Sequence, residues 1–205
     1  MANTSRLAND LLSVDEFYRL VPDGQKADLI DGVIYMASPD SLRANDLTLF
    51  ISCLLRTFLE AREIDGRVFV SRYACHLGEF SAPEPDVGYV CPERVGLMEH
   101  GGLRGRPDIA VEIVSRESRQ RDYNDKRRLY EEAGIPEYWI VDPVQKRMEF
   151  LVLEEGRYQI APLEANRIFR SRSLDGFWID VDWLLSDPLP STIRCLQAIV
   201  GQARS

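Results

Sequence analysis

A glutamate interrupts an otherwise apolar segment near the middle of the sequence. Residues 108–115, DIAVEIVS, have the aliphatic and β-branched composition of a buried strand, and Glu112 lies inside it. Burying an unpaired carboxylate costs several kcal/mol, which is comparable with the stability margin of a whole domain. A partner must therefore hold Glu112, and we predict that this partner is a metal ion.

A second ligand for this ion is expected from a neighbouring strand. Asp108 lies four residues from Glu112, roughly 13 Å away at about 3.3 Å per residue, so the two cannot readily share one cation. Asp86 begins the strand-like segment 85–90, and adjacent strands lie only about 4.8 Å apart. Carboxylate ligands suit a hard cation, so Asp86 and Glu112 predict a site for Mg²⁺ or Mn²⁺.

A lysine completes the predicted set. Lys126 lies in the first turns of a helix expected over residues 122–133, with Asp122 as its expected cap. From there the Lys126 ammonium could reach the sheet end that carries the two acids. At that place it could orient water or stabilise charge on a phosphate. Because a metal ion lowers the pKa of bound water and neutralises phosphate, these residues predict phosphodiester hydrolysis.

The three residues also have purely structural interpretations. Glu112 and Lys126 could form a buried ion pair, and Asp86 after Pro85 could be an ordinary turn residue. These alternatives stay open on the residues alone.

Three further residues are candidates for supporting roles. Asp108 is interpreted first as the entry to its strand, and Ser115 as a cap of the strand end through local backbone bonds. Tyr130 follows Lys126 by four residues and shares its helix face, so it either packs in the core or positions the lysine.

The elements around these residues predict a mixed sheet flanked by helices. Ser13 and Glu16 form a capping-box pattern for a short helix, and Asp-Gly at 31–32 predicts a hairpin turn. Apolar residues recur at helical spacing from residue 45 to 61. Further strands are expected at 67–77, 85–90, 108–115 and 137–143, with a Gly-rich, charged loop at 92–106. We also expect a hairpin over 147–160 that turns at Glu-Glu-Gly, and a segment at 174–185 that packs onto the core.

The overall charge limits the class of partner. The chain has 25 basic and 33 acidic residues, a net charge of -8, which argues against a broad electropositive surface. A local basic cluster lies within residues 116–128, beside the predicted site. Its arginines are predicted to contact a nucleic-acid backbone, with a solvated surface as the alternative: Arg116, Arg119, Arg121 and Arg127.

Other features of the sequence suggest a cytoplasmic protein without a membrane partner. The four cysteines are widely spaced and form no CxxC pair, which favours free thiols in a reducing compartment. The first residues have no basic stretch followed by an apolar core, and no apolar run approaches the roughly 18 residues needed to span a bilayer.

The sequence resembles a known family at these positions. PD at 85–86, EIVS at 112–115, the pair Lys126 and Tyr130, and AGIPEYWIVDP at 133–143 occur in the order of the Uma-two restriction endonucleases of the PD-(D/E)XK nuclease superfamily. The segments SVDEFYRL, LIDGVIYMASP and LDGFWIDVDWLL fit the same pattern, so the resemblance spans most of the chain. PD or ExxS alone is a weak motif, but the ordered set is specific.

The resemblance implies an α/β (α+β) fold with a PD-(D/E)XK nuclease-like core, a mixed β-sheet flanked by helices, an N-terminal hairpin and C-terminal β additions. It implies a single restriction-endonuclease-like domain over residues 1–205, with Mg²⁺ or Mn²⁺ held by Asp86 and Glu112. Val114 occupies the position where the superfamily usually has its lysine. The resemblance makes Lys126, on the following helix, the counterpart of that residue.

Two positions depart from the family pattern. The acid before the Leu-Ile-Asp-Gly turn is usually Glu and is Asp28 here, which could still contact a metal through water. The histidine expected near the start of the long helix is Asn45, and the loss of an imidazole favours a weakened enzyme. We treat both as supporting residues.

These observations predict a metal-dependent endonuclease that hydrolyses DNA phosphodiester bonds, with RNA as an alternative substrate. The resemblance also implies a homodimer, because such nucleases commonly pair to cut two strands. The alternative from another class is a catalytically weakened nuclease-fold protein that acts as a nucleic-acid-binding or regulatory module.

Overall fold

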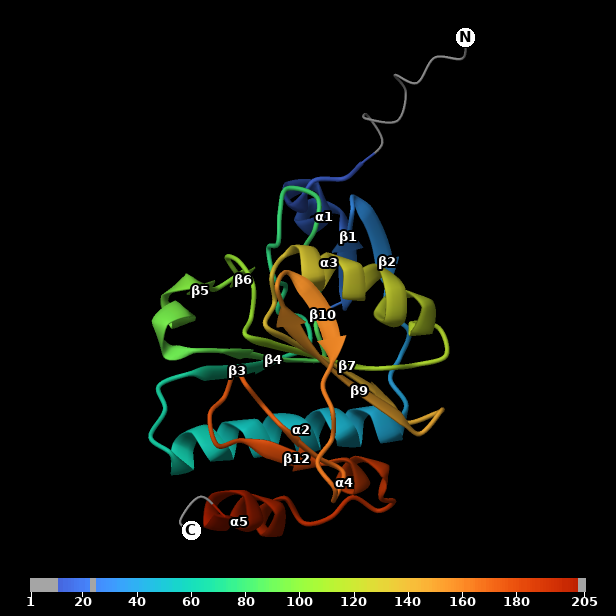
Figure 1. Cartoon of the computed structure of the whole chain (residues 1–205). Helices are drawn as coiled ribbons and strands as arrows, with labels where there is room; N and C mark the ends of the chain where they lie inside the picture. The colour runs from blue at the N-terminus through green and yellow to red at the C-terminus, as the bar shows by residue number, and fades with distance from the viewer. Residues whose placement is uncertain (1–10, 23–24, 203–205) are drawn as a thin grey trace.

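A six-stranded sheet forms the centre of the computed structural model, which describes residues 11–22 and 25–202 (Figure 1). Only β7 and β8 are parallel, so the sheet is mixed as predicted. The segment that connects them carries a helix, as a parallel connection usually does. The strands in spatial order are β10 (Arg157–Ile160), β9 (Arg147–Glu154), β8 (Glu137–Asp142), β7 (Ile109–Ile113), β4 (Val87–Val90) and β3 (Arg67–Val70).

One face of the sheet packs against the long helix α2 (Leu42–Ala61). Ser41 caps this helix through a bond to the Ala44 amide, and the apolar side chains at helical spacing are buried. The C-terminal segment covers the same side of the molecule, with α5 alongside α2 (Figure 1). Its elements are β11 (Ile168–Arg170), β12 (Trp178–Asp180), α4 (Val181–Leu185) and α5 (Thr192–Gln202).

The opposite face of the sheet is covered by a helical segment and by the N-terminal hairpin (Figure 1). The helical segment consists of a π-helix, η3 (Arg121–Lys126), that continues into α3 (Arg127–Glu132). The hairpin pairs β1 (Ala27–Ile30) with β2 (Val33–Met36) and follows the short helix α1 (Val14–Leu20). Side chains of β7 alternate between the two cores, as a period of two requires.

Two predicted hairpin turns are confirmed by their backbone angles. Asp31 and Gly32 have φ of 49° and 77°, and Glu155 and Gly156 have φ of 49° and 77°. Two successive positive φ values define the type I′ turn, whose twist matches that of the flanking strands. The predicted capping box of Ser13 and Glu16 is also present. Trp139, Trp178 and Trp183 belong to the core or pack against it.

Two strand and loop predictions were wrong in extent. The strand expected over 67–77 ends at Val70 and is followed by irregular backbone, although Cys75 forms an isolated bridge with Leu103. The expected loop at 92–106 contains the 3₁₀ helix η2 (Pro92–Leu97) and the small strands β5 (Met98–Glu99) and β6 (Gly102–Leu103). These short elements have too few residues for a periodic pattern to reveal them.

The expected role of Asp122 as a helix cap was also wrong. Its amide already donates to the carbonyl of Ser118, so Asp122 lies inside the first turn. Its side chain turns back to the Ser118 hydroxyl instead of capping the helix. Pattern-based reasoning expects regular α-helix here, whereas π-turns are rare and occur frequently at functional sites.

Candidate active site

The three predicted site residues converge on one pocket of about 290 Å³. Asp86 comes from the segment before β4, Glu112 from β7 and Lys126 from the end of η3. The walls also include loops 36–41, 113–118 and 143–144. Residues far apart in the sequence are therefore brought together at the sheet end where β7 finishes.

Asp86 and Glu112 are placed side by side by the register of the sheet. Val87 of β4 pairs with Val111 of β7, so the next pair along these antiparallel strands is Asp86 and Glu112. Side chains at directly opposed positions lie on the same face, with Cβ atoms about 5 Å apart. The Ile113 amide donates to Asp86 Oδ2 over 2.7 Å, which fixes the orientation of that carboxylate.

Glu112 is held by two donors on the helical segment. Lys126 Nζ donates to Glu112 Oε1 over 2.8 Å, and the Tyr130 hydroxyl donates to the same oxygen over 2.8 Å. Among the described residues, no donor contacts the second oxygen, Glu112 Oε2. Tyr130 therefore does more than pack: it orients Glu112 directly.

The charged states of this pair follow from burial and from neighbouring charges. Burial raises the pKa of Glu112 to about 8. The positive charge of Lys126 lowers this pKa, and the negative charge of Asp86 raises it, but burial has the largest effect. Burial lowers the pKa of Lys126, but the carboxylates of Asp28 and Glu112 more than offset this, so that pKa is raised. Lys126 is consequently an ammonium donor at neutral pH.

Asp28 lines the pocket, and both of its carboxylate oxygens have partners. Its Oδ1 accepts from the Glu84 amide over 2.8 Å, and its Oδ2 lies 3.0 Å from Lys126 Nζ and 3.2 Å from Arg121 Nε. Asp28 thus shares Lys126 with Glu112 and fixes the direction of the lysine. Arg121, which we expected to contact nucleic acid, has its side chain drawn into this network and is only 16% exposed.

A serine and aspartate network supports the mouth of the pocket. The Ser115 hydroxyl accepts from the Ser118 amide over 3.0 Å, the local backbone bond that was expected for Ser115. The Ser118 hydroxyl in turn donates to Asp122 Oδ2 over 2.5 Å. Burial raises the pKa of Asp122 to about 6, and its Oδ1 is sealed from solvent without a hydrogen-bond partner among the described residues.

Lys26 is a pocket residue that the sequence analysis missed. Its ammonium forms a very short contact with Asp86 Oδ1, and its side chain is 19% exposed. Burial lowers the pKa of Lys26, but Asp86 and Glu112 raise it further, which keeps the amine charged. The period of two along the strand could have identified it, because Lys26 stands two residues before Asp28 and so shares its face.

Two expected supporting residues lie elsewhere. Asn45 is exposed on α2 and does not line the pocket. Asp108 sits at the other end of β7, where it accepts from the Cys91 amide over 2.7 Å and pairs with Arg94 over 2.9 Å. Its position matches the first interpretation, an anchor at the entry to the strand.

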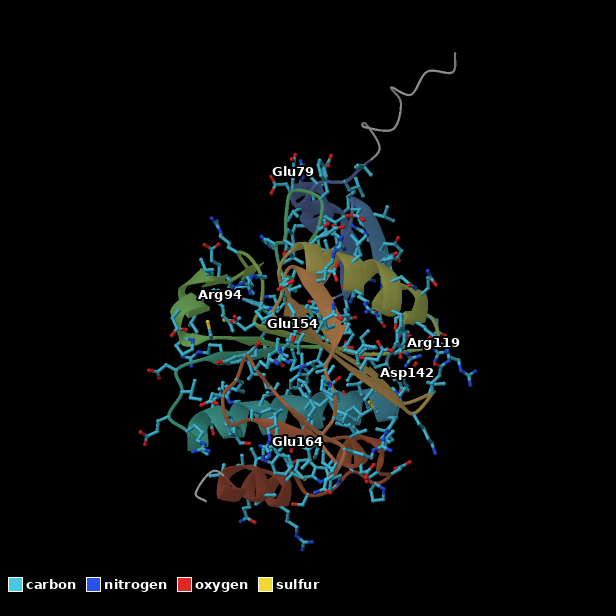
Figure 2. All side chains as sticks on the ribbon, viewed as in Figure 1. Glu79, Arg94, Arg119, Asp142, Glu154 and Glu164 are labelled. Carbon is cyan, nitrogen blue, oxygen red and sulfur yellow. The ribbon has the colours of Figure 1, made fainter. Side chains whose placement is uncertain are left out.

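The remaining arginines of the basic cluster differ in their exposure and in their ion-pair partners. Arg119 pairs with the fully buried Asp142 over 3.1 Å, and Figure 2 shows the two side chains together at the end of β8. Arg127 lies 3.7 Å from Glu149. Arg116 is exposed at the pocket, and within the described residues no acid pairs with it.

The donor set of the pocket fits a magnesium-like ion. In residues 11–22 and 25–202, no group of three His, Cys, Asp or Glu side chains is arranged to hold a metal. Mg²⁺, however, is usually bound through one or two carboxylates and keeps several waters. Glu112 Oε2 lacks a donor and Asp86 Oδ1 holds only an exchangeable ammonium, so these two oxygens are suitable ligands.

The fold is shared with a protein of known structure. The chain matches the crystal structure of a protein from Anabaena variabilis described as a putative nuclease belonging to DUF820, with a TM-score of 0.70 and 16% sequence identity. The match covers 85% of this chain and 97% of the other. At this identity the comparison establishes the fold, and it confirms the predicted fold class.

The family follows from the sequence. A family model named Uma2 and described as a putative restriction endonuclease matches residues 14–182. The chain therefore belongs to the Uma2 (Uma-two) family, which confirms the resemblance. No curated protein matches the chain. Family and fold together indicate a nuclease acting on nucleic acid, in a family for which divalent-metal use is typical.

No membrane crossing is apparent in the described part of the chain. Within residues 11–22 and 25–202, none of the helices combines the length and apolarity that a bilayer span requires. The four cysteines, Cys53, Cys75, Cys91 and Cys195, are free thiols as expected.

Proposed function

We propose that this protein is a metal-dependent endonuclease that hydrolyses phosphodiester bonds in DNA. The observation that carries the proposal is the convergence of Asp86, Glu112 and Lys126 on one pocket at the end of β7. Two carboxylates beside an ammonium are the groups that phosphodiester hydrolysis with a hard cation needs. The structural fit of the pocket and the family membership support the same conclusion.

Asp86 Oδ1 and Glu112 Oε2 would hold Mg²⁺ or Mn²⁺, which supplies an activated water and neutralises phosphate charge when bound. The Ile113 amide holds Asp86, and the Tyr130 hydroxyl holds Glu112, so both carboxylates are oriented before any ligand arrives. Preorganised ligands of this kind need little rearrangement at the moment of reaction.

Lys126 would act as an electrostatic donor to the phosphate. It is 2% exposed and fixed between Asp28 and Glu112. Because it is an ammonium, Lys126 donates a hydrogen bond to the negative charge that develops on the phosphoryl oxygens and does not abstract a proton from water. Asp28 contributes by positioning Lys126.

A competing function is supported by the same ion pairs. Lys126 and Lys26 already neutralise Glu112 and Asp86, as in a site that serves stability or binding without catalysis. In that case the protein would be a nucleic-acid-binding or regulatory module with a nuclease fold. DNA as the substrate in preference to RNA, a homodimer and a cytoplasmic location belong to the leading proposal.

The test is cleavage of supercoiled plasmid, linear duplex DNA and RNA with Mg²⁺, with Mn²⁺ and with a chelator. We expect metal-dependent nicking of DNA that falls about a hundredfold or more in Glu112→Gln, Asp86→Asn and Lys126→Met. Glu149→Gln is the matched control, since Glu149 is equally buried but lies outside the pocket on β9. A wild-type protein that binds DNA but cleaves nothing would establish the binding module instead.

A further inference from the structure

Lys26 is a second amine in the pocket, and the proposed mechanism does not use it. Lys26 lies in the segment just before β1, on the side of Asp86 that faces the pocket. It is less buried than Lys126, with 19% against 2% of the side chain exposed. Both amines line the pocket, but Lys26 is the more accessible of the two.

The contacts of Asp86 show how Lys26 is placed. Asp86 Oδ2 is committed to the Ile113 amide, a backbone bond that does not depend on Lys26. Asp86 Oδ1 forms the ion pair with the Lys26 ammonium. Any cation that Asp86 binds through Oδ1 must therefore displace the ammonium, so Lys26 and a divalent ion compete for a single atom.

The charges lining the pocket suggest where the displaced amine goes. Among the side chains that line it and are not exposed there are four acids, Asp28, Asp86, Glu112 and Asp122, and three bases, Lys26, Arg121 and Lys126. The exposed Asp40, Arg116 and Glu117 also line the pocket, but solvent screens their charges. Fully ionised, the four acids and three bases leave one negative charge. One divalent ion makes the site singly positive, and one phosphodiester, which carries one negative charge, restores neutrality only if Lys26 remains in the pocket.

We propose that Lys26 is a phosphate-binding residue of this site that screens Asp86 until a single divalent ion takes Asp86 Oδ1, and then donates to a non-bridging oxygen of the phosphodiester. This inference rests on the proposed nuclease function. In this arrangement Lys26 supplies the positive charge that a second metal ion provides in two-metal sites. The chemistry of an ammonium suits this exchange, because Lys is a compact point charge on a flexible stem.

Removal of the Lys26 charge should move two measurements in opposite directions. In Lys26→Met we expect Mn²⁺ alone, measured by calorimetry on the full chain without nucleic acid, to bind about tenfold more tightly, because its competitor is gone. We expect affinity for a DNA duplex in Ca²⁺ and cleavage in Mg²⁺ to fall about tenfold or more. Lys26→Arg should keep duplex affinity closer to wild type.

A purely structural Lys26 would give a different result. If the amine only stabilises a buried acid, Lys26→Met lowers the melting temperature and leaves Mn²⁺ affinity unchanged or weaker, which overturns the inference. The matched control is Lys146→Met, in the exposed turn between β8 and β9, which should change neither measurement.

The two proposals fail separately. If wild type cleaves DNA and Lys26→Met cleaves equally well, the role of Lys26 is refuted while the nuclease function stands. If wild type cleaves no nucleic acid, the nuclease function is refuted. The comparison of Mn²⁺ affinity between wild type and Lys26→Met then still decides whether the amine and the ion compete for Asp86.

Discussion

Two buried glutamates lie on neighbouring parallel strands and serve different purposes. Glu112 lies near the end of β7, and Glu137 begins β8, where it is paired in register with Ile109. Glu112 shares a face with Ala110 and Val114, and Glu137 shares the opposite face with Trp139 and Val141. Both side chains are almost inaccessible, at 3% and 0% exposed.

Their partners distinguish the two sites. Glu137 accepts only from neutral donors, namely the Trp139 indole over 2.9 Å, the Ser171 hydroxyl over 3.0 Å, the Ser173 amide over 2.6 Å and the Arg172 amide. It thereby fastens the C-terminal segment to the sheet. Glu112 accepts from an ammonium and a hydroxyl, and its other oxygen has no donor among the described residues. Burial of a carboxylate alone therefore does not mark a functional site.

The largest expected effect concerns the stability of these two positions. Glu137→Gln places an NH₂ group against hydrogen-bond donors and leaves at least one buried amide unpaired, so we expect the free energy of unfolding to fall by about 3 kcal/mol. The melting temperature should fall by about 10 °C. Glu112→Gln keeps an oxygen for Lys126 and Tyr130, so its change should stay within about 1 kcal/mol.

Urea denaturation of both variants in a chelating buffer measures this difference, with Glu149→Gln as a third buried glutamate. The distinction between the two sites breaks down if Glu112→Gln proves as destabilising as Glu137→Gln. Cleavage per folded molecule should be lost in Glu112→Gln and retained in Glu137→Gln.

The sequence shows how far this distinction could have been anticipated. The apolar run around Glu112, the Asp-Gly turn and the helical period of α2 each reflect a local rule, and each prediction was confirmed. The position of Glu137 at the start of EYWIVDP gave no indication of its role. Its donors come from residues 171–173, whose approach to β8 depends on tertiary packing.

The pocket was predictable only in part for the same reason. Asp86 and Glu112 could be paired because strand spacing and alternation are fixed by backbone geometry. The period of two places Lys26 on the face of Asp28. Its contact with Asp86 depends on how the N-terminal hairpin docks on the core, which no local rule specifies. Arg121 was expected on the surface from regular helical spacing. The π-turn of η3 changes that spacing, and no sequence pattern predicts such a turn.

A smaller effect is the response of Glu112 to pH. Because burial raises the pKa of folded Glu112 from its ordinary 4.5 to about 8, the folded state retains a proton that the unfolded chain has released. Stability contributed by this group is therefore complete below about pH 4.5 and is lost as the pH rises towards 8. One titrating proton sets the sign of this change, which is a fall in stability with rising pH.

Unfolding free energies measured at pH 5, 6, 7 and 8 in a chelating buffer test this linkage. The advantage of wild type over Glu112→Gln should shrink steadily as the pH rises, since the glutamine has no proton to lose. Asp122 and Glu84 titrate in both proteins, so their contributions largely cancel. A difference between the two proteins that stays constant with pH would show that Glu112 is ionised throughout.

The smallest effect concerns two surface arginines, one at the pocket and one on β10. Arg116 is exposed at the pocket, whereas Arg157 is 79% exposed on β10 and pairs with Glu131 over 2.8 Å. Neither arginine supports the core, so Arg116→Ala and Arg157→Ala should change stability by less than about 0.5 kcal/mol.

The two variants should differ in nucleic-acid binding. If the nucleic acid lies over the pocket, Arg116 can approach its phosphates and Arg157 cannot. Duplex affinity in Ca²⁺ should then weaken severalfold in Arg116→Ala, with the slope of log affinity against log salt reduced by about one. Equal slopes in both variants and wild type would place the backbone away from Arg116 and would restrict the proposed contact to the buried charges of the pocket.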